Sequence, residues 1–365
     1  MMPQTPSLAR IGMLTSVVAI GAIGGLLATL VGTPLPWLLG AMLATAFALA
    51  LGFRPFGEEL SFPQDVRTGF IAVIGVAIGG TATPEMWAEI GGWWRSLVAV
   101  GAFVAVAHAV NYQIFRRLAG YDQPTAFYCA TPGGLIESVQ LGEEAGGDPA
   151  LLTVQHFSRI AITVTCVPIL YWIMRGEAVG SAAGVSLDTS AAGIGMLDVL
   201  ILFGCGFVGV VGGRRVRMPA AIITGPILVS TIAHGAGLTQ AQPPDWLISV
   251  AQLIIGLGLA MRFKGLDREK LLKGLGFGAL TVAAMLSLGA LFAAALSGIG
   301  PKTFQVLFMC FAPGGVVEMG LIALSLGVSP LIVTLHHVLR ILVTVVAVPI
   351  VATRILQPVK PPDPR

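Results

Sequence analysis

Long apolar runs separated by short polar connections follow one another along the chain. A helix that crosses a membrane needs about 20 mainly apolar residues. Two further apolar stretches, 124–147 and 303–328, are each interrupted by Pro-Gly-Gly. The pattern predicts an all-α polytopic membrane protein in which the interrupted stretches are broken, re-entrant hairpins. The ten segments that meet the length requirement are 11–32, 34–53, 66–83, 93–115, 150–174, 195–213, 219–238, 246–262, 274–298 and 330–356.

The two halves of the sequence repeat this pattern at a separation of 181 residues. Residues 127–169 align with 308–350, and 17 of the 43 aligned positions are identical. Near the start of each half the separation becomes 185, which aligns Pro34 with Pro219. A register kept over this distance indicates an internal duplication. We expect a first membrane repeat over 1–175, a connecting loop over 176–194, a second repeat over 195–356 and a short cytoplasmic tail over 357–365.

The basic residues predict that the two repeats are inverted, because Lys and Arg in short loops favour the cytoplasmic side. If each broken stretch enters and leaves on one side, each repeat crosses five times. Of the 21 basic residues, 16 then lie on one side and three on the other. Full crossing by the broken stretches would divide them ten to nine. We therefore expect inverted repeats in the plasma (inner) membrane with both termini cytoplasmic. A fully crossing broken helix with a span miscounted elsewhere is the alternative.

Composition supports this class of protein and excludes others. Apolar residues make up 55% of the chain and charged residues 11%, whereas soluble domains carry about 25% charged residues. A mean hydropathy of +0.87 excludes a soluble enzyme, a disordered chain and a coiled coil. The net charge of +3, spread over scattered basic residues, argues against a nucleic-acid partner. The four cysteines have neither metal-ligand spacing nor a disulfide framework.

The paired Pro-Gly-Gly breaks are the strongest candidates for a functional site. Proline ends a helix and glycine permits backbone angles that other residues resist. New helices are predicted to begin at Leu135 and Val316, so that their amino ends face the breaks. Interruptions at corresponding places in two halves indicate the binding site of a transporter. A kink that serves only packing is the alternative.

Charged and titratable residues recur beside each break. A Glu stands in the first turn of each new helix, and a His and an Arg three residues apart share one face of the following span. An Arg inside a span needs a partner, and we expect the Glu of the same or the opposite repeat. The histidines are candidates for proton coupling, or else are neutral and bonded to helix carbonyls. The candidate solute- or ion-binding residues are Pro132, Gly133, Gly134, Glu137, His156 and Arg159, with Pro313, Gly314, Gly315, Glu318, His337 and Arg340.

The doubled motif Ala/Thr-Pro-Gly-Gly-x-x-Glu, followed by Gly-x-x-Pro, His-x-x-Arg and Val-Pro, resembles the AbrB-duplication family of bacterial membrane proteins. The resemblance covers nearly the whole chain, and Thr131 stands where the second copy has Ala312. That family is often labelled as a regulator of gene expression or, loosely, as an ammonia monooxygenase. We expect no monooxygenase, because no metal or flavin ligand cluster is present in the sequence. We also expect no direct DNA binding, because no soluble basic module is long enough.

These features predict a secondary transporter of a small polar or anionic solute, with no enzymatic activity, cofactor or metal. Its site is expected between the two breaks, where the arginines and helix ends attract the solute. The expected partners are the lipid bilayer and a small-molecule or ion substrate, and a homo-oligomer is left open. The alternative is a membrane sensor that influences gene expression indirectly.

Overall fold

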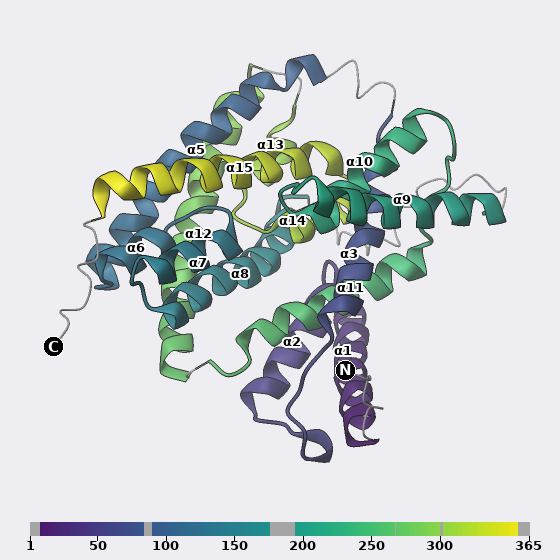
Figure 1. Cartoon of the computed structure of the whole chain (residues 1–365), viewed down its shortest axis with the longest axis horizontal. Helices are drawn as coiled ribbons and strands as arrows, with labels where there is room; N and C mark the ends of the chain where they lie inside the picture. Colours follow the sequence, from purple (N-terminus) through teal and green to yellow (C-terminus); the bar gives the residue numbers. More distant parts are fainter. Residues whose placement is uncertain (1–7, 84–89, 176–193, 267, 300–301, 357–365) are drawn as a thin grey trace. The chain divides into compact units, whose positions relative to one another are not determined.

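The computed structural model of the chain describes residues 8–83, 90–175, 194–266, 268–299 and 302–356. Every regular element among them is a helix, which confirms the all-α prediction (Figure 1). All but the last residue of the predicted connecting loop, and the whole tail over 357–365, lie outside the described residues. The α-helices are α1 (Leu8–Val31), α2 (Pro36–Ala50), α3 (Gln64–Gly79), α5 (Trp94–Gln113), α6 (Gln123–Cys129), α7 (Leu135–Glu144), α8 (Pro149–Arg175), α9 (Met196–Arg215), α10 (Ala221–Gly235), α11 (Asp245–Ala260), α12 (Arg268–Ser297), α13 (Phe304–Phe311), α14 (Val316–Ser325) and α15 (Pro330–Ile355).

Each of the ten predicted spans coincides with one α-helix. Seven helices in the described part of the chain are long and apolar enough to cross a membrane, namely α1, α5, α8, α9, α11, α12 and α15. The other three, α2, α3 and α10, have 15, 16 and 15 residues. At about 1.5 Å per residue they are shorter than the roughly 30 Å hydrocarbon core. The chain is therefore of the membrane type, and these three helices are shorter than the sequence predicts.

The helices form two compact units, and each unit contains segments from both halves of the sequence. Unit 1 comprises Met1–Thr83, Val164–Gly265 and Gly320–Leu331. Unit 2 comprises Pro84–Thr163, Leu266–Met319 and Ile332–Arg365. Helices α8, α14 and α15 are divided between the two units. The division of the sequence into two repeats therefore stays a prediction. The two compact units are divided at other positions of the chain.

Close glycine contacts join the helices of unit 1. Helix α1 packs on α2, and α9 packs on α10. A Cβ atom added to Gly40 would overlap the backbone of Gly24, and one added to Gly225 would overlap the backbone of Gly209. Small residues let helix backbones approach closely, which is how helices associate in lipid. These crossings therefore depend on glycine at both partners.

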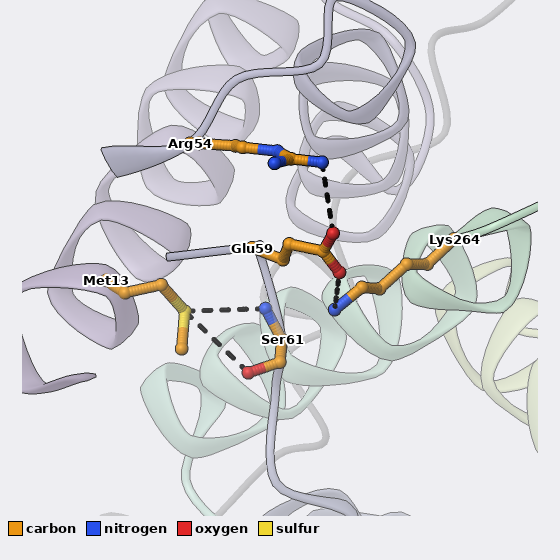
Figure 2. A network of polar contacts seen from close by, with 5 residues as sticks. All are labelled: Met13, Arg54, Glu59, Ser61 and Lys264. Atoms are coloured by element: carbon orange, nitrogen blue, oxygen red, sulfur yellow. Dashed lines mark hydrogen bonds and ion pairs between the residues drawn. The ribbon is translucent and has the colours of Figure 1, made fainter. Parts of the chain in front are cut away.

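A polar network in unit 1 connects the segment between α2 and α3 to α1 and to Lys264, which follows the short helical turn at the end of α11 (Figure 2). The Glu59 carboxylate accepts from Arg54 at 3.1 Å and from Lys264 at 3.3 Å, while the Ser61 amide donates to the Met13 sulfur at 3.4 Å. The Arg54 and Glu59 side chains are 64% and 57% exposed. Exposed ion pairs contribute little to stability. Burial of apolar side chains around Met13 is therefore the main stabilising contribution here.

Aromatic clusters anchor the helices that lead into the two breaks of unit 2. The Phe311 ring, at the end of α13, lies 5.3 Å from the Phe103 ring of α5. The Phe127 ring of α6 lies 4.7 Å from the His108 ring of α5, edge to face. Edge-to-face and tilted aromatic pairs add to the stability that burial provides. Both entry helices therefore pack on α5 through aromatic side chains.

Candidate functional site

All twelve predicted site residues lie in unit 2. The first break runs from 130 to 134, between α6 and α7, and the second from 312 to 315, between α13 and α14. Helices α7 and α14 begin at Leu135 and Val316, the two residues at which the sequence predicts new helices. Gly134 precedes α7 with φ of 60°, in the left-handed region that favours glycine. Both breaks are buried except for Gly315, which is half-buried.

Helix α8 holds the first break through its His and Arg. The Arg159 guanidinium donates through Nη1 to the carbonyl of Thr131, and His156 Nε2 lies 3.1 Å from the carbonyl oxygen of Tyr128. Both side chains are buried, with 5% of Arg159 and none of His156 exposed. The last carbonyls of α6 have no helical donors, because the chain breaks there. The α8 side chains therefore supply partners that the helix itself cannot.

Helix α15 holds the second break in a similar way. Arg340 donates through Nη1 to the carbonyl of Ala312 at 2.5 Å and through Nη2 to the carbonyl of Gly314. His337 Nε2 also faces the Ala312 carbonyl, at 3.2 Å. Thr131 and Ala312 are equivalent positions of the two halves, so the two guanidiniums bind equivalent carbonyls, each in its own break. Arg340 also binds the carbonyl of Gly314, two residues further into its break.

The contacts of the two arginines differ from the expected pairing of arginine with glutamate. The guanidiniums of Arg159 and Arg340 donate to backbone carbonyls of their breaks. A guanidinium has five N–H donors, so it satisfies several carbonyl oxygens at once, whereas a carboxylate accepts only. The broken backbone therefore provides the polar surroundings that a buried arginine needs. The Nε atoms of both arginines have no hydrogen-bond partner among the described residues.

The two carboxylates differ in exposure although they occupy equivalent positions. The Glu137 side chain is exposed, and only 4% of Glu318 is exposed. Each carboxylate lies over the second glycine of its break. Glu137 Oε2 is 3.5 Å from the place of a Cβ on Gly134, and Glu318 Oε2 would overlap a Cβ on Gly315. The sequence predicts matching roles, and the structure distinguishes them.

Each break also contacts the helix of the other half. A Cβ on Gly133 would lie 3.2 Å from the Thr344 hydroxyl oxygen, and one on Gly134 would lie 3.1 Å from Val345 Cγ2. In the second break a Cβ on Gly314 would lie 3.4 Å from Thr163 Cγ2. Thr163 and Thr344 are themselves equivalent residues of α8 and α15. Helix α15 therefore contacts the glycines of the first break, and α8 contacts the second.

Two features of the site were not predicted. The Thr131 hydroxyl donates to the Ser138 hydroxyl at 2.7 Å, and Ser138 donates to the carbonyl of Gly133 at 3.3 Å. The second break has Ala312 and Met319 at those positions, so the first break is the more polar of the two. The Thr163–Thr344 pair is the other feature. Identity of two polar residues at the repeat separation, inside apolar helices, was the signal that could have identified it.

The predicted absence of a bound metal stays a prediction. Among the described residues no three His, Cys, Asp or Glu side chains lie close enough to hold a metal ion. The polar groups at the breaks are carbonyls, hydroxyls, carboxylates and guanidiniums. Such groups suit a small polar or charged molecule.

An all-helical chain with seven helices able to cross a membrane, and with paired helix breaks inside one unit, defines a membrane-type protein. Residues 37–356 match the profile of a family described as "Transition state regulatory protein AbrB". The chain belongs to this AbrB family. It is 23% identical over 353 residues to "Uncharacterized protein YhjN" of Bacillus subtilis (strain 168), covering 91% of this chain and 90% of that protein. It is 21% identical over 319 residues to "Putative regulator AbrB" of Escherichia coli (strain K12), covering 87% and 89%.

Proposed function

We propose that this protein is a secondary transporter of the inner membrane, without enzymatic activity, that binds a small polar or anionic solute between its two helix breaks. One observation carries the proposal: both breaks lie in unit 2, and each contacts both α8 and α15. Broken helices from two related halves that meet at shared helices are the usual construction of transporter sites. If the breaks were kinks that serve only packing, the two breaks would not need to contact the same helices.

Electrostatics favours an anionic or polar solute. Arg159 and Arg340 are both buried, so two guanidinium charges lie at the breaks. The amino ends of α7 and α14 add partial positive charge at the breaks. Backbone carbonyls accept hydrogen bonds from the Nη atoms of each guanidinium. The Nε–H donors of both arginines are available to a ligand. The solute would then take its contacts from these donors and from the hydroxyls of the first break. Glu137, Glu318 and the two histidines are the proton-coupling candidates.

The proposal includes an inverted duplication, and contacts in unit 1 support the duplication. Helices α3 and α11 have the same bounds at a separation of 181 residues. A Cβ on Gly75 of α3 would meet the Ile223 carbonyl, and one on the equivalent Gly256 of α11 would meet the Leu38 carbonyl. Ile223 and Leu38 are equivalent at the separation of 185. Reciprocal contacts of this kind arise when two copies exchange elements about a two-fold axis.

A membrane sensor is the second candidate, and the names of relatives favour it. One relative carries the word regulator in its name, as does the description of the family. A sensor would use the same site to bind a solute without moving it. Output would then require a partner protein. Both candidates place the ligand at the same residues, so a measurement of flux separates them.

The test begins with a thermal-shift screen of purified protein against carboxylates, phosphate, sulfate, amino acids and sugars. Each stabilising compound is then measured in proteoliposomes as counterflow of the radiolabelled compound. We expect counterflow that Glu137→Gln or Glu318→Gln abolishes, with an exposed Glu58→Gln variant as the control. Saturable binding with no flux would favour the sensor. Stabilisation that survives replacement of both Arg159 and Arg340 would contradict an anion site at the breaks.

A further inference from the structure

The corner that joins α9 to α10, residues 214–217, carries three arginines with no assigned role. Arg214, Arg215 and Arg217 are exposed, as is Val216 between them. None of the three makes an ion pair or hydrogen bond through its side chain with any residue in the described part of the chain. Three unpaired guanidiniums within four residues form a concentrated positive patch that attracts phosphate groups.

The backbone of this corner does not require arginine. The equivalent corner after α1, residues 29–32, has the same turn: Met218 N donates to the Gly213 carbonyl at 2.9 Å, and Thr33 N donates to the Ala28 carbonyl at 3.0 Å. That corner reads Thr-Leu-Val-Gly and has no basic residue. The comparison within one chain shows that the fold forms this turn without positive charge.

Arg217 is in a conformation that costs free energy for any residue with a Cβ. Its φ is 55°, in the left-handed region, and the equivalent Gly32 has φ of 75°. Glycine is the usual residue at this position after a helix, because it has no Cβ penalty. Arginine at this position is therefore a local destabilisation, and its side chain is free to act on another molecule.

An apolar strip leads along α9 to the arginines. Leu200, Phe203 and Phe207 are spaced three and four residues apart, and Arg214 follows Phe207 by two turns, so the four share one face. Phe203 and Phe207 are 71% and 62% exposed, while the opposite face of α9 packs on α10 through Gly209 and Gly213. From Phe203 to Arg214 the helix rises about 16 Å, roughly half of the hydrocarbon core. An acyl chain laid along this strip would bring its headgroup to the arginines.

We propose that the α9–α10 corner, with the apolar strip of α9, binds an anionic phospholipid whose phosphate lies among Arg214, Arg215 and Arg217. The ligand is a lipid because the apolar strip leads to the positive patch at Arg214. Each arginine near an anionic headgroup strengthens binding by about fivefold. A general preference of basic loops for the cytoplasm would account for the charge of the corner, but not for arginine at the left-handed position.

The experiment uses the full chain, purified and reconstituted in phosphatidylcholine nanodiscs with or without phosphatidylglycerol. Two quantities are measured: the thermal midpoint, and the number of phosphatidylglycerol molecules retained after extraction, by native mass spectrometry. We expect phosphatidylglycerol to stabilise the unmodified protein. The triple variant Arg214→Gln, Arg215→Gln, Arg217→Gln is expected to lose that gain and the retained lipid. Arg116→Gln, Arg117→Gln, Arg354→Gln removes three exposed charges elsewhere and is expected to keep both.

If the triple variant does not insert into the membrane, a single substitution at Arg217 tests the proposal. Arg217→Gly is expected to raise the midpoint in phosphatidylcholine, because strain is removed, and to reduce phosphatidylglycerol retention about fivefold. Unchanged retention in either variant would overturn the proposal. Equal stabilisation by inorganic phosphate or glycerol 3-phosphate would also overturn it, because the site would then recognise a soluble phosphate.

Discussion

Arg159 and Arg340 illustrate how a charged residue is retained inside an apolar bundle. Each guanidinium donates to carbonyls that the Pro-Gly-Gly break has deprived of helical partners. A buried acceptor left without a partner costs about 1–3 kcal/mol. The break and the arginine therefore stabilise each other, and neither is expected to occur alone in this fold.

Replacing these arginines should have unequal effects. Arg340→Ala removes two hydrogen bonds to break carbonyls and Arg159→Ala removes one, so Arg340→Ala should lower the free energy of unfolding by about 1–3 kcal/mol more. Denaturant unfolding in detergent measures the difference. Arg340→Lys should restore only part of the loss, because one ammonium does not reproduce the planar fork. Equal losses in the two alanine variants would contradict this account.

Asp148 joins the start of α8 to α12. Its carboxylate accepts from the amides of Ala150 and Leu151, at the start of α8, and from Lys270 Nζ at 2.9 Å. Partial burial raises the pKa of Asp148, but the hydrogen bond from Lys270 and the two backbone bonds outweigh it, and the net pKa is lowered. The residue therefore caps α8 and connects it to α12.

This lowered pKa predicts a dependence of stability on acidity. The contribution of Asp148 is fully present above its unfolded pKa of about 4, and is lost as the pH falls through the lower folded pKa. Asp148→Ala should cost about 1 kcal/mol at neutral pH and little in strong acid. Unfolding curves between pH 3 and 7, compared with an exposed Glu144→Ala control, measure it. A cost that does not decrease in acid would contradict the assignment.

At the scale of helices, two glycine crossings set the packing of unit 1. Gly24 meets Gly40, and Gly209 meets Gly225, at the same places in the two halves. The obstacle to a larger residue at each crossing is backbone, which cannot rotate away as a side chain can.

Alanine at the crossings should therefore destabilise the protein. Gly40→Ala and Gly225→Ala should each cost about 1–3 kcal/mol, because the added methyl group forces the helices apart. Gly101→Ala and Gly212→Ala, in helices where the Cβ meets open space, should be neutral or stabilising by up to about 1 kcal/mol. Thermal unfolding of the four variants gives the comparison. Tolerance of alanine at both crossings would show that the helices separate easily.

At the scale of the whole molecule, the proposed inversion makes a prediction about sidedness. Val31 and Val216 are equivalent, exposed residues at the ends of α1 and α9. Cysteines placed there in a cysteine-free background should label from opposite sides of the membrane, with Val216→Cys on the cytoplasmic side. A membrane-impermeant maleimide, applied to intact cells and to inverted vesicles, makes the measurement. Labelling of both from one side would show parallel repeats.

The sequence predicted most of the helices because their signals are local. Ten apolar runs became ten helices, and the starts of α7 and α14 were predicted at Leu135 and Val316. Lengths were less accurate, since apolar residues continue past the ends of α2 and α10 into turns. The carbonyl partners of Arg159 and Arg340 were not predicted, because residue types along the sequence do not show which backbone carbonyls a break exposes.

By itself, the sequence determined the helical class, the membrane-type composition, the duplicated pattern and the identity of the twelve candidate residues. Those properties depend on periodicity, hydropathy and residue type, which are read along the chain. Only the tertiary structure decided that both breaks share unit 2, that guanidiniums bind carbonyls, and that Glu137 is exposed while Glu318 is buried. These depend on contacts between residues far apart in sequence, which packing alone fixes.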